Sequence, residues 1–242
     1  MLVKQFSLNP LRPAFSPELA VIRNVRLPYG GPTGTGGAFA KGLVLGCVGG
    51  SAQSEVVTLS AGTGTHTCTF TGDKVYTVSH AANASLASVQ TLWEGVFGTG
   101  NVAVTGTPGT SYVLTFQGQL ANTRIGGLFA VSSAGGSPSW ARTTRGTSGA
   151  GQFDGYSDGG TNDRPTTARA VLMYDYTSDP KGGLVTEAGP TGQPYQPQAY
   201  VSGFFNVGDL TGLDANAVAD PGFRIVEGAA ITDTGAVIGL GV

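Results

Sequence analysis

The stretch HTCTFTGDKVYTV, residues 66–78, decides the fold class of this chain. Within residues 66–70, threonine alternates with larger side chains, and this period of two is typical of a strand with one buried face. After Gly72, residues 74–78 again bring β-branched and aromatic side chains, which favour strands. The stretch therefore predicts two successive strands separated by a turn.

Composition extends this interpretation to the whole chain. Of the 242 residues, 40 are glycine and 13 are proline, whereas these two residues together usually make up about 12% of a protein. The glycines fall between short Val/Thr/Phe/Tyr runs, as turns do in all-β proteins. Blocks rich in Ala, Glu, Lys and Leu, typical of coiled coils and helix bundles, are absent. With 40% hydrophobic residues the chain can form a core, and we predict a mainly β protein.

Charge and polarity exclude several classes of function. The net charge is −2 without a basic stripe, so we expect no direct contact with nucleic acid. No apolar run follows Lys4, and no stretch approaches the ~20 apolar residues of a membrane span. We therefore expect neither a signal peptide nor a membrane partner. Two cysteines, Cys47 and Cys68, form no disulfide framework, which fits a reducing cytosol and leaves a single bridge between them open.

Residues 53–135 differ from the rest of the chain because threonine, valine and alanine dominate them. A helix is predicted over residues 81–96, where apolar side chains recur at spacings of three and four residues and so share one face. We interpret the segment as an inserted β-rich domain carrying one helix, which ends at the Gly-Gly-Ser-Pro loop. The helix face comprises Leu86, Val89, Leu92, Trp93 and Val96. The strands predicted around the helix cover residues 56–59, 66–70, 74–78, 101–105, 112–116 and 127–131.

The flanking residues, 30–52 and 136–242, are predicted to form a second unit, the scaffold. Residues 30–37 are expected to be a flexible loop, and the strand that follows places Val44, Leu45 and Val48 in the core. The scaffold strands at 43–48 and 170–176 lie on either side of the insert in the sequence. We expect them to be neighbours in the structure, with the insert tethered between them. The other predicted scaffold elements are strands at 168–176, 198–206, 223–226 and 235–240, and a short helix at 209–219.

Residues 1–29 are predicted to form an extended arm. Pro10, Pro13 and Pro17 prevent a helix there. An extended segment can add a strand to the sheet of another protein, although a floppy terminus is the open alternative. The candidate contact residues are the apolar side chains at the end of the arm, Val21, Ile22, Val25, Leu27 and Tyr29.

Four segments resemble, in the same order, the head decoration proteins of lambda-like tailed phages. They are AKGLVLG at 40–46, AVLMYD at 170–175, YVSGFFNVGDLTGLD at 200–214 and FRIVE at 223–227. Together the match spans about half of the chain. The family has a short stretch between its first and middle strands, whereas about 120 residues intervene here. Part of this insert, in residues 87–118, resembles a small β-rich module repeated in some large phage and bacterial surface proteins.

The resemblance implies a structural role. Decoration, or cement, proteins bind the outer capsid surface as homotrimers at threefold and quasi-threefold positions and stabilise the expanded phage head. The implied scaffold is small and β-barrel-like, of the β-tulip type, with one short helix. The implied partners are the major capsid protein and two further copies of this chain, and no cofactor is implied. The protein would be made in the host cytoplasm and located on the outside of the virion.

Few residues are candidates for catalysis. His66 and Cys68 share a strand face with His80 nearby in sequence, but these residues do not supply a full tetrahedral set of zinc ligands, and packing roles are expected. Cys68 has no evident base to form a thiolate. Ser148 is flanked by glycines, but its segment lacks the strand-to-helix elbow that exposes a serine nucleophile. We therefore predict that the protein is not an enzyme and holds no metal.

Two alternatives stay open at this point. Asp154, Asp158 and Asp163 lie in one glycine-rich loop with Asn162, where they would either hold calcium or be solvated. The chain could also be a phage or bacterial surface adhesin that recognises glycans through an exposed tryptophan. For this second function Trp140 is a candidate, because Trp93 is expected in the core face of the helix.

Overall fold

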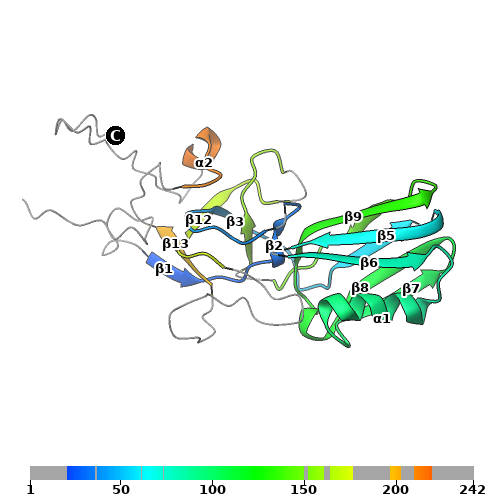
Figure 1. Ribbon diagram of the computed structural model, residues 1–242. Helices are drawn as coiled ribbons and strands as arrows, with labels where there is room; N and C mark the ends of the chain where they lie inside the picture. Colours follow the sequence, from blue (N-terminus) through cyan, green and yellow to red (C-terminus); the bar gives the residue numbers. More distant parts are fainter. Residues whose placement is uncertain are drawn as a thin grey trace, which may run out of the picture.

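The computed structural model shows a mainly β protein, as predicted, with three sheets and two α-helices among the residues that it describes (Figure 1). None of the sheets closes into a barrel within that part of the chain. The described residues are 21–35, 37–60, 62–72, 74–149, 152–160, 164–176, 197–202 and 210–219.

One sheet has five antiparallel strands that come from distant parts of the sequence. Val171 lies opposite Val44 and Ala170 opposite Leu45, so the two scaffold strands that flank the insert are neighbours, as expected. Val44, Leu45 and Val48 are buried, which confirms the predicted core of this strand. In order across the sheet the strands are β1 (Val21–Asn24), β13 (Gln198–Ser202), β12 (Ala168–Leu172), β3 (Val44–Cys47) and β11 (Phe153–Gly155).

The other two sheets have four strands each and enclose one shared core together with the helix α1. We call these two sheets and α1 the sandwich. The first sheet has the order β10 (Trp140–Thr144), β4 (Val56–Ser60), β8 (Ser111–Phe116), β7 (Val102–Thr107). The second has the order β2 (Tyr29–Thr33), β9 (Ile125–Gly135), β5 (Thr63–Thr71), β6 (Val75–Ala81), with β2 and β9 parallel.

Helix α1 (Leu86–Phe97) begins where Ser85 caps it, because the Ser85 hydroxyl accepts a hydrogen bond from the Ser88 amide at 3.2 Å. It ends at Gly98, whose φ of 90° is unfavourable for other residues. The predicted start at residue 81 was too early, because β6 runs to Ala81 before the chain turns into the helix. The predicted apolar face is confirmed by three fully or nearly fully buried residues, Val89, Trp93 and Val96.

Aromatic rings fill the core of the sandwich. Phe97 of α1 lies edge-on to Phe116 at 4.9 Å between ring centroids and to Phe70 at 5.0 Å. Edge-to-face pairs of this kind add to the free energy gained from burial. The five-stranded sheet has a separate core on each of its faces, where small and aliphatic side chains pack together with tyrosine and phenylalanine rings.

Several elements differ from the sequence-based expectations. The expected loop at 30–37 is wrong for residues 30–33, because Tyr29–Thr33 forms β2. Strands β10 and β11 were not predicted, and β12 ends at Leu172 rather than at residue 176. Helix α2 (Ala215–Ala219) covers only the last part of its predicted range. The strands predicted at 223–226 and 235–240 lie outside the described residues.

The part of the sandwich from β4 to β10 begins and ends at one place. The amide of Gln53 donates to the Thr147 carbonyl, and the amide of Thr147 donates to the Gln53 carbonyl, both at 2.9 Å. Residues 53–135 supply β4 to β9 and α1, but the two sandwich sheets also contain β2 and β10, which lie outside the bounds of the predicted insert. Independent folding of residues 53–135 stays a prediction.

Candidate functional site

The five predicted contact residues of the arm fall into two groups. Val25 and Leu27 are buried in the core of the five-stranded sheet, and Tyr29 is buried in the core of the sandwich. Val21 has 43% of its surface exposed, and Ile22 is half-buried. Both lie on β1, which pairs with β13 on one side and forms an edge of its sheet on the other. Residues 1–20 lie outside the described part of the chain, and capsid contact stays a prediction.

A buried carboxylate, Glu55, organises one end of the sandwich. Its Oε1 accepts hydrogen bonds from Arg142 Nη1 at 2.6 Å and Arg145 Nη1 at 3.3 Å. Its Oε2 accepts from the amides of Ile125 at 3.1 Å and Gly146 at 2.9 Å. A buried carboxylate needs such partners, because the loss of hydration otherwise makes its charged form strongly unfavourable.

Arg142 links β10, the edge strand of one sandwich sheet, to β9 of the other. Its Nη1 also donates to the Ile125 carbonyl, and its Nη2 donates to the carbonyls of Gly126 at 3.0 Å and Gly127 at 2.9 Å. No backbone ladder joins β9 and β10 among the strands that the structure defines, so this guanidinium connects them instead. Burial lowers the pKa of Arg142, and the neighbouring Glu55 opposes that shift.

A second buried ion pair joins the sandwich to the five-stranded sheet. Arg124 Nε lies 3.0 Å from Asp154 Oδ2, and Asp154 Oδ1 accepts from the amides of Thr33 at 3.2 Å and Gly155 at 2.7 Å. Asp154 belongs to β11, whereas Thr33 belongs to β2.

The Arg124–Asp154 ion pair bears on whether the aspartate-rich loop holds calcium or is solvated. Asp154 is fully buried and is not part of a solvated loop. Asp158 accepts from Asn216 Nδ2 at 2.7 Å, so it has a partner as well. Asn162 and Asp163 lie outside the described residues.

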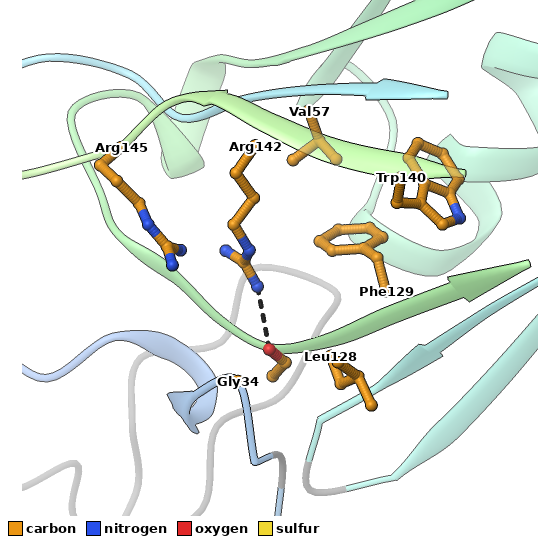
Figure 2. A pocket seen from close by; sticks show the side chains of 8 residues that line it. Gly34, Val57, Leu128, Phe129, Trp140, Arg142 and Arg145 are labelled. Carbon is orange, nitrogen blue, oxygen red and sulfur yellow. Dashed lines mark hydrogen bonds between the residues drawn. The ribbon is translucent and has the colours of Figure 1, made fainter. Parts of the chain in front are cut away.

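A cavity of about 270 Å³ lies between β9 and β10 (Figure 2). Figure 2 shows Arg142 and Arg145 extending toward β9, with Phe129 reaching up from β9 beside Trp140. The indole Nε1 of Trp140 donates to the Ala130 carbonyl at 3.1 Å, which fixes the ring across the gap. The cavity is lined by Gly34, Val57, Gly127, Leu128, Phe129, Trp140, Arg142 and Arg145.

His66, Cys68 and His80 meet inside the sandwich. The two histidines lie opposite each other on β5 and β6 with ring centroids 5.3 Å apart, and the Cys68 sulfur lies 3.9 Å from His80 Nε2. His66 Nε2 accepts from the Gly62 amide at 3.1 Å, so Nδ1 carries the proton and has no hydrogen-bond partner. Burial, together with the neighbouring His80, lowers the pKa of His66.

His66, Cys68 and His80 are all buried in the folded protein, as their expected packing roles require. Among the described residues, no three His, Cys, Asp or Glu side chains are grouped so that they could hold a metal ion. Burial raises the pKa of Cys68 to about 12, so its thiol stays protonated and is a poor nucleophile. Cys47 is exposed and both cysteines are free, so the bridge left open by the sequence is not formed. The buried Ser148 hydroxyl has no partner that could act as its base.

The sequence predicted the histidine–cysteine face but missed the arginines and carboxylates. The available signal was the segment WARTTR at 140–145, where Trp140 and Arg142 fall on the same face of a strand. Glu55 gave no such signal, and Asp154 was considered only as a calcium ligand or a solvated residue, because the ion-pair partners of both are distant in sequence.

Comparison with protein-family models, with curated proteins and with solved structures finds no match for this chain. None of the described helices is long and apolar enough to cross a membrane. The proposals below therefore rest on the residues and geometry of this protein.

Proposed function

We propose that this is a capsid decoration protein, which binds the outer surface of an expanded phage head as homotrimers at threefold and quasi-threefold positions. In this proposal the five-stranded sheet belongs to a β-tulip-type scaffold that faces the major capsid protein, and the sandwich is an insert that points away from the shell. The protein is not an enzyme and needs no cofactor.

One observation carries the proposal. Three of the segments that resemble decoration proteins are far apart in the sequence, yet their strands β3, β12 and β13 are adjacent in one sheet. Apart from β2, the sandwich is built between the first and second of these segments, from residues that lie between the two ends of the Gln53–Thr147 bridge. This arrangement supports a common scaffold with an inserted unit, since insertions are tolerated where their two ends lie close together.

The outer edge of β1 is the proposed capsid contact. An edge strand presents unpaired amide and carbonyl groups, which can pair with a strand of another protein. Val21 and Ile22 add apolar surface at this edge. In a trimer, three weak contacts act together through their high effective concentration, and binding only to the intact shell stabilises that shell by mass action.

The test is to add the purified protein to expanded, undecorated heads and to image the particles. We expect saturable binding with three copies around each threefold position. A Val21→Asp variant should bind at least tenfold more weakly, because it places a charge at the proposed contact. The matched control is Val75→Asp, since Val75 is 66% exposed but lies on β6 of the sandwich.

Three outcomes would overturn the proposal. One is a failure of the protein to bind heads. Another is density for isolated monomers at fivefold vertices. The third is equal weakening by Val21→Asp and Val75→Asp, which would mean that the β1 edge is not the contact.

A further inference from the structure

We propose that two copies of this protein pair through the outer edge of β6, so that their sandwich sheets join across a twofold axis. Strand β6 is the last strand of the sheet that also contains β2, β9 and β5 (Figure 1). An antiparallel pair of identical edges uses the same surface on both molecules, which is the geometry of a twofold contact. The inference is independent of capsid binding, because β6 belongs to the sandwich and not to the proposed capsid face.

Every second residue of β6 directs its backbone groups away from β5. Just past one end of the strand, the Ala82 amide donates to the Gly64 carbonyl at 2.8 Å, and at the other end the Gly72 amide donates to the Lys74 carbonyl at 2.9 Å. Hydrogen-bonded positions alternate along an antiparallel pair, and β5 and β6 pair without a register shift. The even-numbered residues of β6 therefore bond to β5. The residues with outward amides and carbonyls are Val75, Thr77, Ser79 and Ala81.

Most of these outward groups are open. Within the described part of the chain, no residue bonds to the outward amides or carbonyls of Val75, Thr77 and Ser79, and all three residues are exposed. The Ala81 carbonyl differs, because it accepts a hydrogen bond from His80 Nδ1 at 2.9 Å. The open part of the edge is therefore centred on Thr77.

The three other edge strands of the sandwich each make a contact outside their own sheet. On β7, the Val104 amide donates to Gln90 Oε1 of α1 at 3.3 Å. On β10, Arg142 reaches the carbonyls of β9, and on β2 the Thr33 amide donates to Asp154 at 3.2 Å. Strand β6 also lacks the usual protection of an edge, because its sequence VYTVSHA contains no proline, no lysine and no bulge.

A second copy fits this edge in one register. When Thr77 lies opposite the partner's Thr77, Val75 lies opposite the partner's Ser79, and each of these pairs can exchange two backbone hydrogen bonds. This register does not use the Ala81 carbonyl. Opposed threonines are a favourable cross-strand pair, and no like charges meet along the contact.

The pairing is expected to be weak. One pair of strands buries much less than the ~800 Å² per partner of a standard interface, so we expect a Kd of about 1 mM. Purified protein would be mainly monomeric at low concentration. Copies held side by side on a surface reach such concentrations locally and would pair there.

Disulfide trapping in solution tests the contact, in the full chain with Cys47→Ser to remove the exposed native thiol. Hydrogen-bonded positions of an antiparallel pair place Cα atoms about 5.5 Å apart, within the range of about 4.4–6.8 Å that a disulfide spans. Thr77→Cys should therefore form a covalent dimer on oxidation. The matched control is Thr69→Cys, because Thr69 lies opposite Thr77 but on β5, one strand in from the edge. We expect it to cross-link at least about tenfold more slowly.

A mixture of two variants tests the register. Val75→Cys and Ser79→Cys should cross-link to each other when mixed, and much less when each is oxidised alone, because the antiparallel register pairs position 75 with position 79.

Proline tests whether the backbone makes the contact. Thr77→Pro removes an outward amide without removing a hydrogen bond to β5. It should weaken self-association at least about tenfold in sedimentation equilibrium, whereas Thr77→Val keeps the amide and should stay within about twofold of the wild type. Circular dichroism melting checks that each variant is folded.

Several outcomes would overturn the proposal. They are the absence of a Thr77→Cys dimer, equally fast cross-linking of Thr69→Cys, and unchanged self-association of Thr77→Pro. Cross-linking of Val75→Cys alone as fast as in the mixture would overturn the register. The capsid test described above stays separate, because on sparsely decorated heads no two molecules are neighbours, and its failure would not affect this result.

Discussion

The sandwich and the five-stranded sheet show two ways of building a β structure from one chain. In the sandwich, β4 to β10 follow one another closely in sequence, and β5 pairs with β9 over residues 63–71 and 128–135. In the five-stranded sheet, the strands come from five separate stretches between residues 21 and 202, and β12 and β13 pair at only two positions, Val171–Tyr200 and Leu172–Ala199.

This difference predicts an order of folding. Contacts between residues close in sequence cost less loop entropy to form than distant contacts. When the sandwich has formed, the Gln53–Thr147 bridge brings the chain ends on either side of it together. The pairing of β3 with β12 then closes a much shorter effective loop. The sandwich is therefore expected to support the five-stranded sheet more than the reverse.

Gly126→Ala should have the largest effect, because it breaks the pairing of β2 with β9 inside the sandwich. A Cβ at Gly126 would overlap the carbonyl of Gly31, and both are backbone positions held by the β2–β9 pairing. We expect a loss of about 4 kcal/mol or more in the free energy of unfolding, measured by urea denaturation. The matched control is Gly95→Ala in α1, where a Cβ meets nothing within 4 Å, and a gain of about 0.5–1 kcal/mol is expected. Wild-type stability of Gly126→Ala would mean that β2 is not held against β9.

Glu55→Gln should weaken the sandwich from within. The change leaves Arg142 and Arg145 without their shared carboxylate, and removing one member of a buried ion pair typically costs about 3–5 kcal/mol. We expect a loss of about 3 kcal/mol by the same measurement. Glu94→Gln is the control, because Glu94 accepts hydrogen bonds from Gln90 and Gly100 without a cation, and a loss below about 1 kcal/mol is expected. A similar cost for both variants would contradict the role of Glu55.

Each region carries one cysteine, and labelling of the buried one reports the opening of the sandwich, with the exposed one as an internal reference. Cys47 of β3 is exposed, whereas Cys68 of β5 is buried with a pKa of about 12. At pH 8 roughly one Cys68 thiol in ten thousand is ionised even before access is considered. We expect Ellman's reagent to modify Cys47 at least about 1,000-fold faster than Cys68. Comparable rates would show that the sandwich opens readily and would contradict its expected stability.

Acidification should produce the smallest effect, and it should act on the sandwich. The pKa of His66 is lowered in the folded protein, so the unfolded chain takes up a proton first as the pH falls below about 6.5. Stability contributed by neutral His66 is complete above that pH and decreases below it, by at most about 1.4 kcal/mol per pH unit for one proton. The groups that face His66 are His80 and Cys68. Melting temperatures between pH 7.5 and 5 check this, and His66→Asn should flatten the profile. An equally steep profile in that variant would assign the effect to another group.

Local patterns in the sequence predicted much of the sandwich. Alternation identified β5, and the spacing of apolar residues identified the buried face of α1, because both depend on neighbours in sequence. Strand β2 could not be found in this way. Its sequence YGGPT has no strand pattern, and all five residues are buried only because β9 and β11 pack around them.

The candidate contact residues show a second limit of prediction from the sequence. Val25, Leu27 and Tyr29 are apolar, and this property does not distinguish a surface for a partner from the protein's own core. The arginine and carboxylate clusters were missed for a related reason. Arg142 acts through the carbonyls of Ile125, Gly126 and Gly127, and this pairing exists only after β9 and β10 have come together.

The position of Arg142 also bears on how the protein behaves when many copies are crowded together. Carbonyl groups at an open strand edge attract strands from other molecules and promote aggregation. Here one guanidinium occupies three consecutive carbonyls of β9, and a guanidinium carries only donors. This stretch also pairs with β2, so an incoming strand would have to displace both β2 and the Arg142 guanidinium before it could pair here. Pairing between the sandwiches of neighbouring molecules is therefore not expected at this stretch.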